Sequence, residues 1–244
     1  MDYDHVASAY DRRYDLNAYD GVRDYLHRFI ASSADVSVLE AGCGTGHWLA
    51  ELGSHRVSLV AGVDVAAAML IRARTAAPGA LLLRATASRL PFADETFDRI
   101  FCVNALHHFP DRPAFFGEAY RVLRKRGSFL SIGLDPHAGS DSWWIYDYFP
   151  AARRADEIRY RPTGELRASL AAAGFSRTQT DVAQQLSAEV PFAEARANGV
   201  LDRHSTSQLM VIADDEFATG IARIEAERPV LRADLRLYAT RAEK

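Results

Sequence analysis

The sequence predicts an α/β fold in which seven strands form a doubly wound, mostly parallel sheet with an antiparallel last strand. Three observations lead to this prediction. Short β-branched runs alternate with helical runs through most of the chain, which is typical of βαβ units. A glycine-rich turn at residues 42–46 joins the first strand to the helix that follows it. Residues 231–240 alternate between apolar and polar side chains, as a half-exposed antiparallel strand does.

The expected elements follow one another along the chain in a regular order. Residues 1–30 are predicted to form a helical N-terminal cap, and residues 31–135 a ligand-binding core. Strands are expected at residues 36–40, 58–63, 80–85, 97–103, 127–134, 175–182 and 231–240. Helices are expected at residues 47–53, 66–76, 113–124 and 163–173. Residues 136–162 and 183–230 would cover the sheet, with a helical insertion at 191–228 between the sixth and seventh strands.

Length and composition favour one domain without a membrane-spanning segment. The chain has 244 residues, 48% of them hydrophobic, so residues 1–244 are expected to form a single domain around one core. No stretch approaches the ~18 consecutive apolar residues of a membrane span. The first residues lack the basic start and apolar run of a signal peptide. We therefore expect a cytoplasmic protein with no membrane partner.

Charge and cysteine usage argue against a nucleic-acid-binding protein and against a zinc or disulfide framework. The 29 basic and 32 acidic residues give a net charge of -3, and the basic residues are scattered, so no nucleic-acid partner is expected. Cys43 and Cys102 lack the spacing of a zinc set or a disulfide framework and are expected to be reduced packing residues. No grouping of His, Asp or Glu has metal-ligand spacing, so no metal is expected. The sequence does not indicate the oligomeric state.

The glycine turn and an aspartate after it predict a nucleoside site. Gly42, Gly44 and Gly46 follow the first strand, at the sheet edge where open α/β folds bind ligands. Without a Cβ they let the backbone approach a ligand, and the helix N-terminus behind them favours a carboxylate. Asp64 ends the second strand, at the distance expected of an acceptor for ribose hydroxyls. His47 stands where a dinucleotide-binding turn needs Gly or Ala.

Four segments in order resemble the class I S-adenosylmethionine-dependent methyltransferases, in their small-molecule, type 11-like branch. The segments are Val38–Gly46, Gly62–Asp64, Leu90–Asp98 and Asn104–Phe109. The resemblance covers most of the chain and implies a Rossmann-like sheet. It also implies transfer of a methyl group from S-adenosylmethionine to an oxygen, nitrogen or carbon atom of a small-molecule acceptor.

The same resemblance implies a set of cofactor-binding residues. Asp64 would bind both ribose hydroxyls, and Glu40 with the glycine backbone would hold the methionine end. Tyr10, in a segment similar to the family's N-terminal cap, would close over the methionine carboxylate, although packing against a helix is the alternative. The expected set is Tyr10, Glu40, Gly42, Cys43, Gly44, Gly46, Asp64, Val65, Met69, Thr86, Ala87, Asn104 and Ala105.

One position departs from the family pattern. Many relatives have an aspartate that accepts a hydrogen bond from the adenine amino group, whereas this chain has Thr86. The Thr86 hydroxyl can accept the same bond, and the backbone N–H of Ala87 can still reach a ring nitrogen. We therefore expect adenine recognition to rely more on the backbone.

Histidines after the fourth strand are the main catalytic candidates. A sulfonium has a neutral leaving group, so much of the rate can come from positioning the acceptor. A hydroxyl acceptor benefits from a base, and His107 and His108 follow the fourth strand, where the reacting centre is expected. Asp135, with His137 nearby, is the next candidate. The alternatives are that the histidines pack beneath a loop and that Asp135-Pro136 is a turn.

The acceptor is expected beneath the cover segments. Five aromatic residues lie within residues 143–149, and such side chains are common in pocket walls as well as in cores. We expect Trp143, Trp144 and Tyr146 to contact the acceptor. Arg203 or His204 could meet an acidic group on it, although a solvent-exposed helix face is the alternative for both.

Other functions remain open at this point. One is a nicotinamide-dependent oxidoreductase, which the spacing of the glycines and the Asn104–Phe109 segment disfavour. Another is a non-catalytic regulatory protein that keeps the cofactor pocket, because a fold does not guarantee activity. A third is a cyclisation or decarboxylation that uses the same cofactor. The acceptor and the methylated atom cannot be read from the sequence.

Overall fold

The computed structural model describes residues 11, 14, 18–31, 35–54 and 56–244. The strands are β1 (Val36–Ala41), β2 (Val57–Asp64), β3 (Leu81–Arg84), β4 (Phe97–Val103), β5 (Leu123–Leu134), β6 (Ser142–Trp143), β7 (Ser176–Pro191) and β8 (Val230–Glu243). The helices are α3 (Asp20–Ala31), α4 (His47–Glu51), η1 (Leu52–Ser54), α5 (Ala67–Ala76), η2 (Leu106–His108), α6 (Arg112–Val122), α7 (Trp144–Tyr148), α8 (Pro150–Arg159), α9 (Thr163–Ala172), α10 (Phe192–Ala197), α11 (Ser207–Met210) and α12 (Asp214–Glu227).

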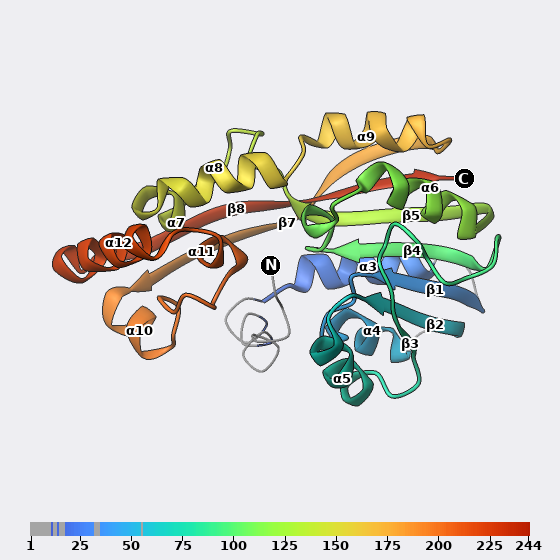
Figure 1. The fold of residues 1–244 in the computed structure, drawn as a ribbon, viewed down its shortest axis with the longest axis horizontal. Helices are drawn as coiled ribbons and strands as arrows, with labels where there is room; N and C mark the ends of the chain where they lie inside the picture. The colour runs from blue at the N-terminus through green and yellow to red at the C-terminus, as the bar shows by residue number, and fades with distance from the viewer. Residues whose placement is uncertain (1–10, 12–13, 15–17, 32–34, 55) are drawn as a thin grey trace.

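One sheet organises the described residues, in the order β3-β2-β1-β4-β5-β8-β6, with β7 paired to β8 (Figure 1). Strands β1 to β5 pair in parallel, and β8 runs antiparallel to β5 and to β7. This confirms the predicted mostly parallel α/β sheet with an antiparallel last strand. The two-residue strand β6 is an addition that the sequence pattern did not predict, because it is too short to show alternation.

Adjacent residues of the central strands supply two separate cores. Leu39 and Ile100 pack beneath α6 and α9, whereas their neighbours Val38 and Phe101 pack beneath α3, α4 and α5. Successive side chains of a strand point to opposite faces, so helices on both sides are needed to bury them (Figure 1). This doubly covered sheet leaves the carboxyl ends of its parallel strands free to form a site.

Strands β7 and β8 are longer than the sequence pattern predicted. They pair from Ser176 and Glu243 to Pro191 and Val230, so residues 183–190, predicted as part of the cover, continue the sixth predicted strand. The far half of this ribbon carries α7, α8, α10, α11 and α12, and we call this part the outer lobe (Figure 1). The predicted insertion at 191–228 is helical in three separate pieces, and residues 136–162 contain α7 and α8, which were not predicted. The ribbon exceeds its prediction because each strand satisfies the backbone of the other.

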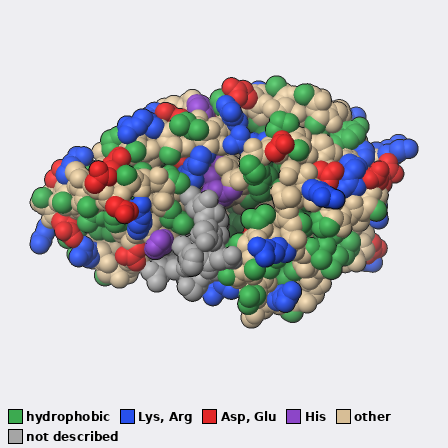
Figure 2. Space-filling view, viewed as in Figure 1, with side chains coloured by type: hydrophobic (Ala, Val, Ile, Leu, Met, Phe, Trp, Pro, Cys, Tyr) green, Lys and Arg blue, Asp and Glu red, His purple; other side chains and the backbone are tan. Residues whose placement is uncertain are grey.

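The outer lobe has its own hydrophobic cluster. Trp144, Phe149, Leu209 and Ile224 are buried in it together. Gly220 allows this packing, because a Cβ at that position would lie 2.1 Å from the Phe149 ring. Basic and acidic side chains are interspersed over the face of the molecule drawn in Figure 2. None of the helices among the described residues is long and apolar enough to cross a membrane.

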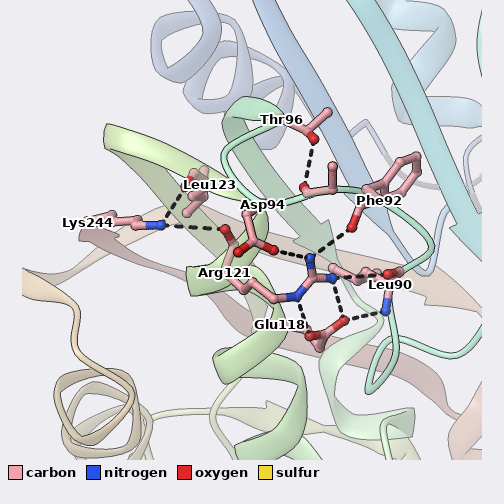
Figure 3. A network of polar contacts seen from close by, with 9 residues as sticks. Leu90, Phe92, Asp94, Thr96, Glu118, Arg121, Leu123 and Lys244 are labelled. Carbon is pink, nitrogen blue, oxygen red and sulfur yellow. Dashed lines mark hydrogen bonds and ion pairs between the residues drawn. The ribbon is translucent and has the colours of Figure 1, made fainter.

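A polar network centred on Arg121 attaches the loop before β4 to α6 (Figure 3). The Arg121 guanidinium donates to both carboxylate oxygens of Glu118, at 2.7 and 2.9 Å, and to Asp94 Oδ1 at 2.7 Å. It also donates to the carbonyl oxygens of Phe92 and Leu90, at 2.9 and 3.2 Å. Glu118 in turn accepts the backbone N–H of Leu90 at 2.7 Å. The network therefore fixes a loop whose earlier residues reach the sheet edge.

Replacing Arg121 with leucine should destabilise the protein, because Glu118 would lose its partner and two carbonyl groups their donors. We expect the free energy of unfolding to fall by about 2–3 kcal/mol, measured by urea denaturation. Lys125→Ala, at a nearby exposed position, is the matched control and should change it by less than about 0.5 kcal/mol. Equal effects of the two substitutions would show that the network contributes little.

Candidate functional site

The glycine turn after β1 approaches the end of β4 very closely. Gly42 has a φ of 72°, and a Cβ there would lie 2.7 Å from the Cβ of Ala105. Gly46 has a φ of 81°, and its Cβ would lie 2.9 Å from the Cα of Ala73 on α5. Both positions need glycine for its backbone conformation and for space. The turn is therefore held in a shape that presents backbone at the sheet edge.

The Asp64 carboxylate joins this turn to the start of α5. Its Oδ2 accepts the backbone N–H of Gly44 at 2.9 Å, and its Oδ1 accepts the N–H of Ala66 at 2.9 Å. Each carboxylate oxygen keeps further acceptor capacity, and the side chain is only half-buried. Asp64 can therefore organise the turn and still accept hydrogen bonds from a ligand.

A cavity of about 260 Å³ lies at this edge, and we call it the cofactor cavity. Its lining contains nine of the expected cofactor residues: Gly42, Gly44, Asp64, Val65, Met69, Thr86, Ala87, Asn104 and Ala105. It also contains seven that were not assigned to the cofactor, Val63 on β2 and, after the third and fourth strands, Ala85, Ser88, His108, Phe109, Pro110 and Asp111. For the last six, their place after the third and fourth strands was the available signal, because parallel strands end at one edge.

Glu40, Cys43 and Gly46 do not line this cavity. Glu40 is 1% exposed, and its Oε2 has no hydrogen-bond partner among the described residues. Burial, with a smaller contribution from Asp64, raises the pKa of Glu40 well above the ordinary value. Burial also raises the pKa of the Cys43 thiol, reinforced by Glu40 and Asp64. Cys43 therefore packs as a protonated thiol, and the Glu40 side chain lies buried behind the glycine turn.

The N-terminal segment contacts the glycine turn where it is described. Tyr10, the expected cap residue, lies outside the described residues. Asp11 accepts a hydrogen bond from the Thr45 hydroxyl at 2.5 Å and pairs with Arg72 at 3.0 Å. The Tyr14 ring stacks on His47, with centroids 3.5 Å apart. Asp11 and Tyr14 are thus held against the glycine turn and the helix that follows it.

A second cavity, of about 430 Å³, lies between the outer lobe and the sheet edge, and we call it the cover cavity. Trp143 and Trp144 line it, together with residues of β7 and β8. It shares Asn104 and His108 with the cofactor cavity. Histidine side chains are visible near the middle of the molecular face in Figure 2, between the outer lobe and the core. The two cavities therefore meet at the end of β4.

The two histidines after β4 occupy different positions. His108 lines both the cofactor and cover cavities. His107 lines the cover cavity but not the cofactor cavity, and its ring stacks on Tyr160 with centroids 4.1 Å apart. The hydroxyl of Tyr160 lies 3.2 Å from His107 Nε2. His108 is therefore the better placed of the two to reach a reacting group.

The catalytic role expected for Asp135 is not supported. Its carboxylate accepts the backbone N–H groups of His137 at 3.1 Å and of Thr163 at 2.8 Å. The residue is 4% exposed and lines neither the cofactor cavity nor the cover cavity. Asp135 instead connects the end of β5 to the start of α9.

Three of the residues expected at the acceptor lie away from the cover cavity. The Tyr146 hydroxyl donates to Asp156 at 2.8 Å, and its ring packs behind Trp143 with centroids 5.3 Å apart. Arg203 donates to the carbonyl of Ile212, pairs with Asp214 at 3.1 Å and lies over the Phe217 ring. His204 is exposed. A contact of Arg203 or His204 with an acidic acceptor group is therefore not supported, because the loop before α12 uses Arg203 to anchor itself.

Comparisons with known proteins agree with the fold. Residues 39–131 match the methyltransferase domain family. The 27-O-demethylrifamycin SV methyltransferase of Amycolatopsis mediterranei is 28% identical over 85% of this chain and 78% of that protein. A second relative is the phthiotriol/phenolphthiotriol dimycocerosates methyltransferase 1 of Mycobacterium ulcerans, which is 33% identical over 50% of this chain. The match spans 48% of the length of that relative. The solved structure of phosphoethanolamine N-methyltransferase 2 of Haemonchus contortus, in complex with S-adenosylmethionine, superimposes on this chain with a TM-score of 0.63 and 16% sequence identity. The superposition covers 99% of this chain and 57% of that one.

Residues 39–131 thus form a methyltransferase domain, and the chain is an S-adenosylmethionine-dependent methyltransferase with S-adenosylmethionine as its cofactor. The residues present fit this cofactor. The half-buried Asp64 carboxylate can accept ribose hydroxyls, and Gly42 and Gly44, both at positive φ, present backbone without a side chain in the cavity lining. The unpartnered buried oxygen of Glu40 suits the positively charged methionine end. The nicotinamide alternative is thereby set aside.

Replacing Asp64 with alanine should weaken S-adenosylmethionine binding about tenfold or more, because it removes a charged acceptor for two hydroxyls. Isothermal titration calorimetry measures this loss. Asp64→Asn keeps the shape but replaces one acceptor by a donor, and it should also bind weakly. The Gly44 and Ala66 contacts imply some loss of stability as well. Unchanged affinity in a folded variant would disprove the assignment.

Glu40→Gln should flatten the dependence of stability on pH. Because the pKa of Glu40 is raised in the folded state, the unfolded chain loses this proton first as pH rises above about 4.3. The folded state then binds more protons, so wild-type stability decreases with pH from that point up to the folded pKa. We expect the melting temperature of the variant, relative to wild type, to increase between acidic and neutral pH. Glu165→Gln, at an exposed position, is the control, and parallel curves for wild type and Glu40→Gln would contradict the prediction.

Proposed function

We propose that this enzyme methylates a hydroxyl group of a neutral, largely apolar small molecule bound in the cover cavity. The observation that carries the proposal is that His108 and Asn104 line both cavities. A reacting acceptor atom must come within ~3–3.5 Å of the methyl group. The end of β4 is a place where cofactor and acceptor can meet at that distance.

The chemistry divides between the cofactor and the residues of the chain. S-adenosylmethionine supplies an electrophilic methyl group on a sulfonium that leaves as a neutral thioether. The glycine turn and Asp64 orient the cofactor from one side. His108 accepts the proton of the acceptor hydroxyl as its oxygen attacks, which is the role of a general base. Trp143 and Trp144 exclude water from the acceptor side.

The lining of the cover cavity supports a neutral acceptor. Among the described residues it contains no lysine or arginine, and Glu194 is its only carboxylate. The polar groups are amides and hydroxyls, such as Gln184, Gln208 and Thr206, set among aromatic and aliphatic side chains. Such groups bind hydroxyls and carbonyls without demanding charge. The names of two relatives agree with this, since each acts on a rifamycin or phthiotriol compound.

The direct test supplies purified protein with methyl-labelled S-adenosylmethionine and with 27-O-demethylrifamycin SV, the compound named for one relative, beside other hydroxylated polyketides. Label transferred to a hydroxyl oxygen, located by mass spectrometry, supports the proposal. Transfer to nitrogen or carbon would refute the choice of atom. Cofactor binding without transfer to any such compound would favour the regulatory alternative, and conversion without transfer would favour a cyclisation or decarboxylation.

His108→Ala should lower kcat on such an acceptor by about 10²–10⁴-fold. The loss should be greatest below the pKa of the acceptor hydroxyl and shrink at high pH, where the hydroxyl ionises unaided. Cofactor affinity should stay within about threefold, a difference of under about 1 kcal/mol. His107→Ala is the matched control and should have the smaller effect on kcat, because His107 does not line the cofactor cavity. Full activity of the His108 variant would exclude a base at this position.

A further inference from the structure

A third cavity, of about 380 Å³, lies between α6 and α9 over the carboxyl end of β5 and the part of β8 that pairs with it, at Tyr238 and Thr240. It shares Asn104, Leu134, His107 and Tyr160 with the cover cavity, and Asn104 and Ala105 with the cofactor cavity. The stacked pair of His107 and Tyr160 therefore forms part of the wall of both the arginine cavity and the cover cavity. Its lining differs from that of the cover cavity in charge. Three arginines, Arg112, Arg159 and Arg161, line it, with Glu165 as the only carboxylate among the described lining residues. We call it the arginine cavity.

Arg112 carries a positive charge that no carboxylate neutralises among the described residues. Its Nε donates to the carbonyl of Leu106 at 3.4 Å and its Nη2 to the carbonyl of Arg159 at 2.5 Å. Both partners are neutral, and Nη1 remains available as a donor. Burial and the neighbouring Arg161 both lower the pKa of Arg112. A half-buried guanidinium beside a second cation is unfavourable unless an anion is present.

The other charged groups around the cavity do not supply that anion. Arg159 is paired with the fully buried Asp156. Glu165 lies 3.9 Å from Arg161, and both side chains are more than half exposed, so this pair is weak. Asp135, at the end of β5, uses its two oxygens on backbone N–H groups. The charge of Arg112 therefore stays uncompensated.

We propose that the arginine cavity binds a small organic anion through a carboxylate or phosphate group held between Arg112 and Arg161. A guanidinium presents planar, charged donors that match both groups. The bound anion would neutralise Arg112, and Arg161 at the exposed rim would attract it from solvent. The cavity is large enough for a small metabolite and has no lining residue of the glycine turn. Arg112 and Arg161 line neither the cofactor cavity nor the cover cavity, so the anion site adjoins both cavities at Asn104 but is formed by different charged residues.

Calorimetric titration tests the site with inorganic phosphate and, separately, with succinate. Both titrations are run at constant ionic strength and with saturating S-adenosylhomocysteine, which keeps anions out of the cofactor cavity. We expect binding of at least one probe, and the tighter one distinguishes a phosphate from a carboxylate ligand. Arg161→Gln and Arg112→Gln should each weaken it by about fivefold or more. Arg154→Gln, at an exposed position on α8 outside this lining, is the control and should bind as wild type does.

Three results would overturn the proposal. One is the absence of binding by both probes at millimolar concentration. The second is equal affinity in wild type and Arg161→Gln, which decides the matter even if Arg112→Gln fails to fold. The third is binding that disappears when the cofactor cavity is filled, because the anion would then belong to that cavity. None of these results depends on whether the enzyme methylates a hydroxyl.

Discussion

The functional edge of this protein depends on the Asp64 carboxylate. Its two oxygens accept N–H groups from the glycine turn and from the start of α5. These two segments follow neighbouring parallel strands, β1 and β2, whose carboxyl ends lie side by side. One side chain therefore fixes the turn, begins the next helix and faces the cofactor cavity. The close contact of Gly42 with Ala105 then sets how near the end of β4 comes to the same point.

The acceptor side of the site is formed by the long β7–β8 ribbon and by the outer lobe that it carries. The buried carboxylate of Asp156 on α8 connects the helices of the lobe. It accepts hydrogen bonds from Tyr146 on α7 and Gln208 on α11, and it pairs with Arg159 on α8. Nε and Nη1 of Arg159 are buried with no hydrogen-bond partner among the described residues. Buried charged networks of this kind do little for stability unless complete. Here the network fixes the relative positions of three short helices behind Trp143.

Neighbouring cavities with different electrostatic character follow from this arrangement. The cofactor cavity has the carboxyl groups of Asp64 and Asp111 in its lining and that of Glu40 behind it, which suits a cationic cofactor. The cover cavity is nearly uncharged, and the arginine cavity is positive. His107 and Tyr160 line both of the last two, His108 lines both of the first two, and Asn104 lines all three. The loop after β4 is thus the point at which all three meet.

The sequence by itself determined the sheet, the glycine turn and most of the cofactor cavity. These features depend on local patterns: strand alternation, glycines that need positive φ, and an acidic residue at a strand end. Only the tertiary structure decided which distant side chains share a cavity. Trp143 and Tyr146 look equivalent in sequence, yet one lines the cover cavity and the other binds Asp156 behind it. In sequence Asp135 and Arg203 look like functional residues, but in the structure they are held by backbone groups and an ion pair. Nothing in the sequence pattern indicated a role for Arg112. The physical reason is that a side chain's role depends on partners brought to it by packing, and those partners are far away in the chain.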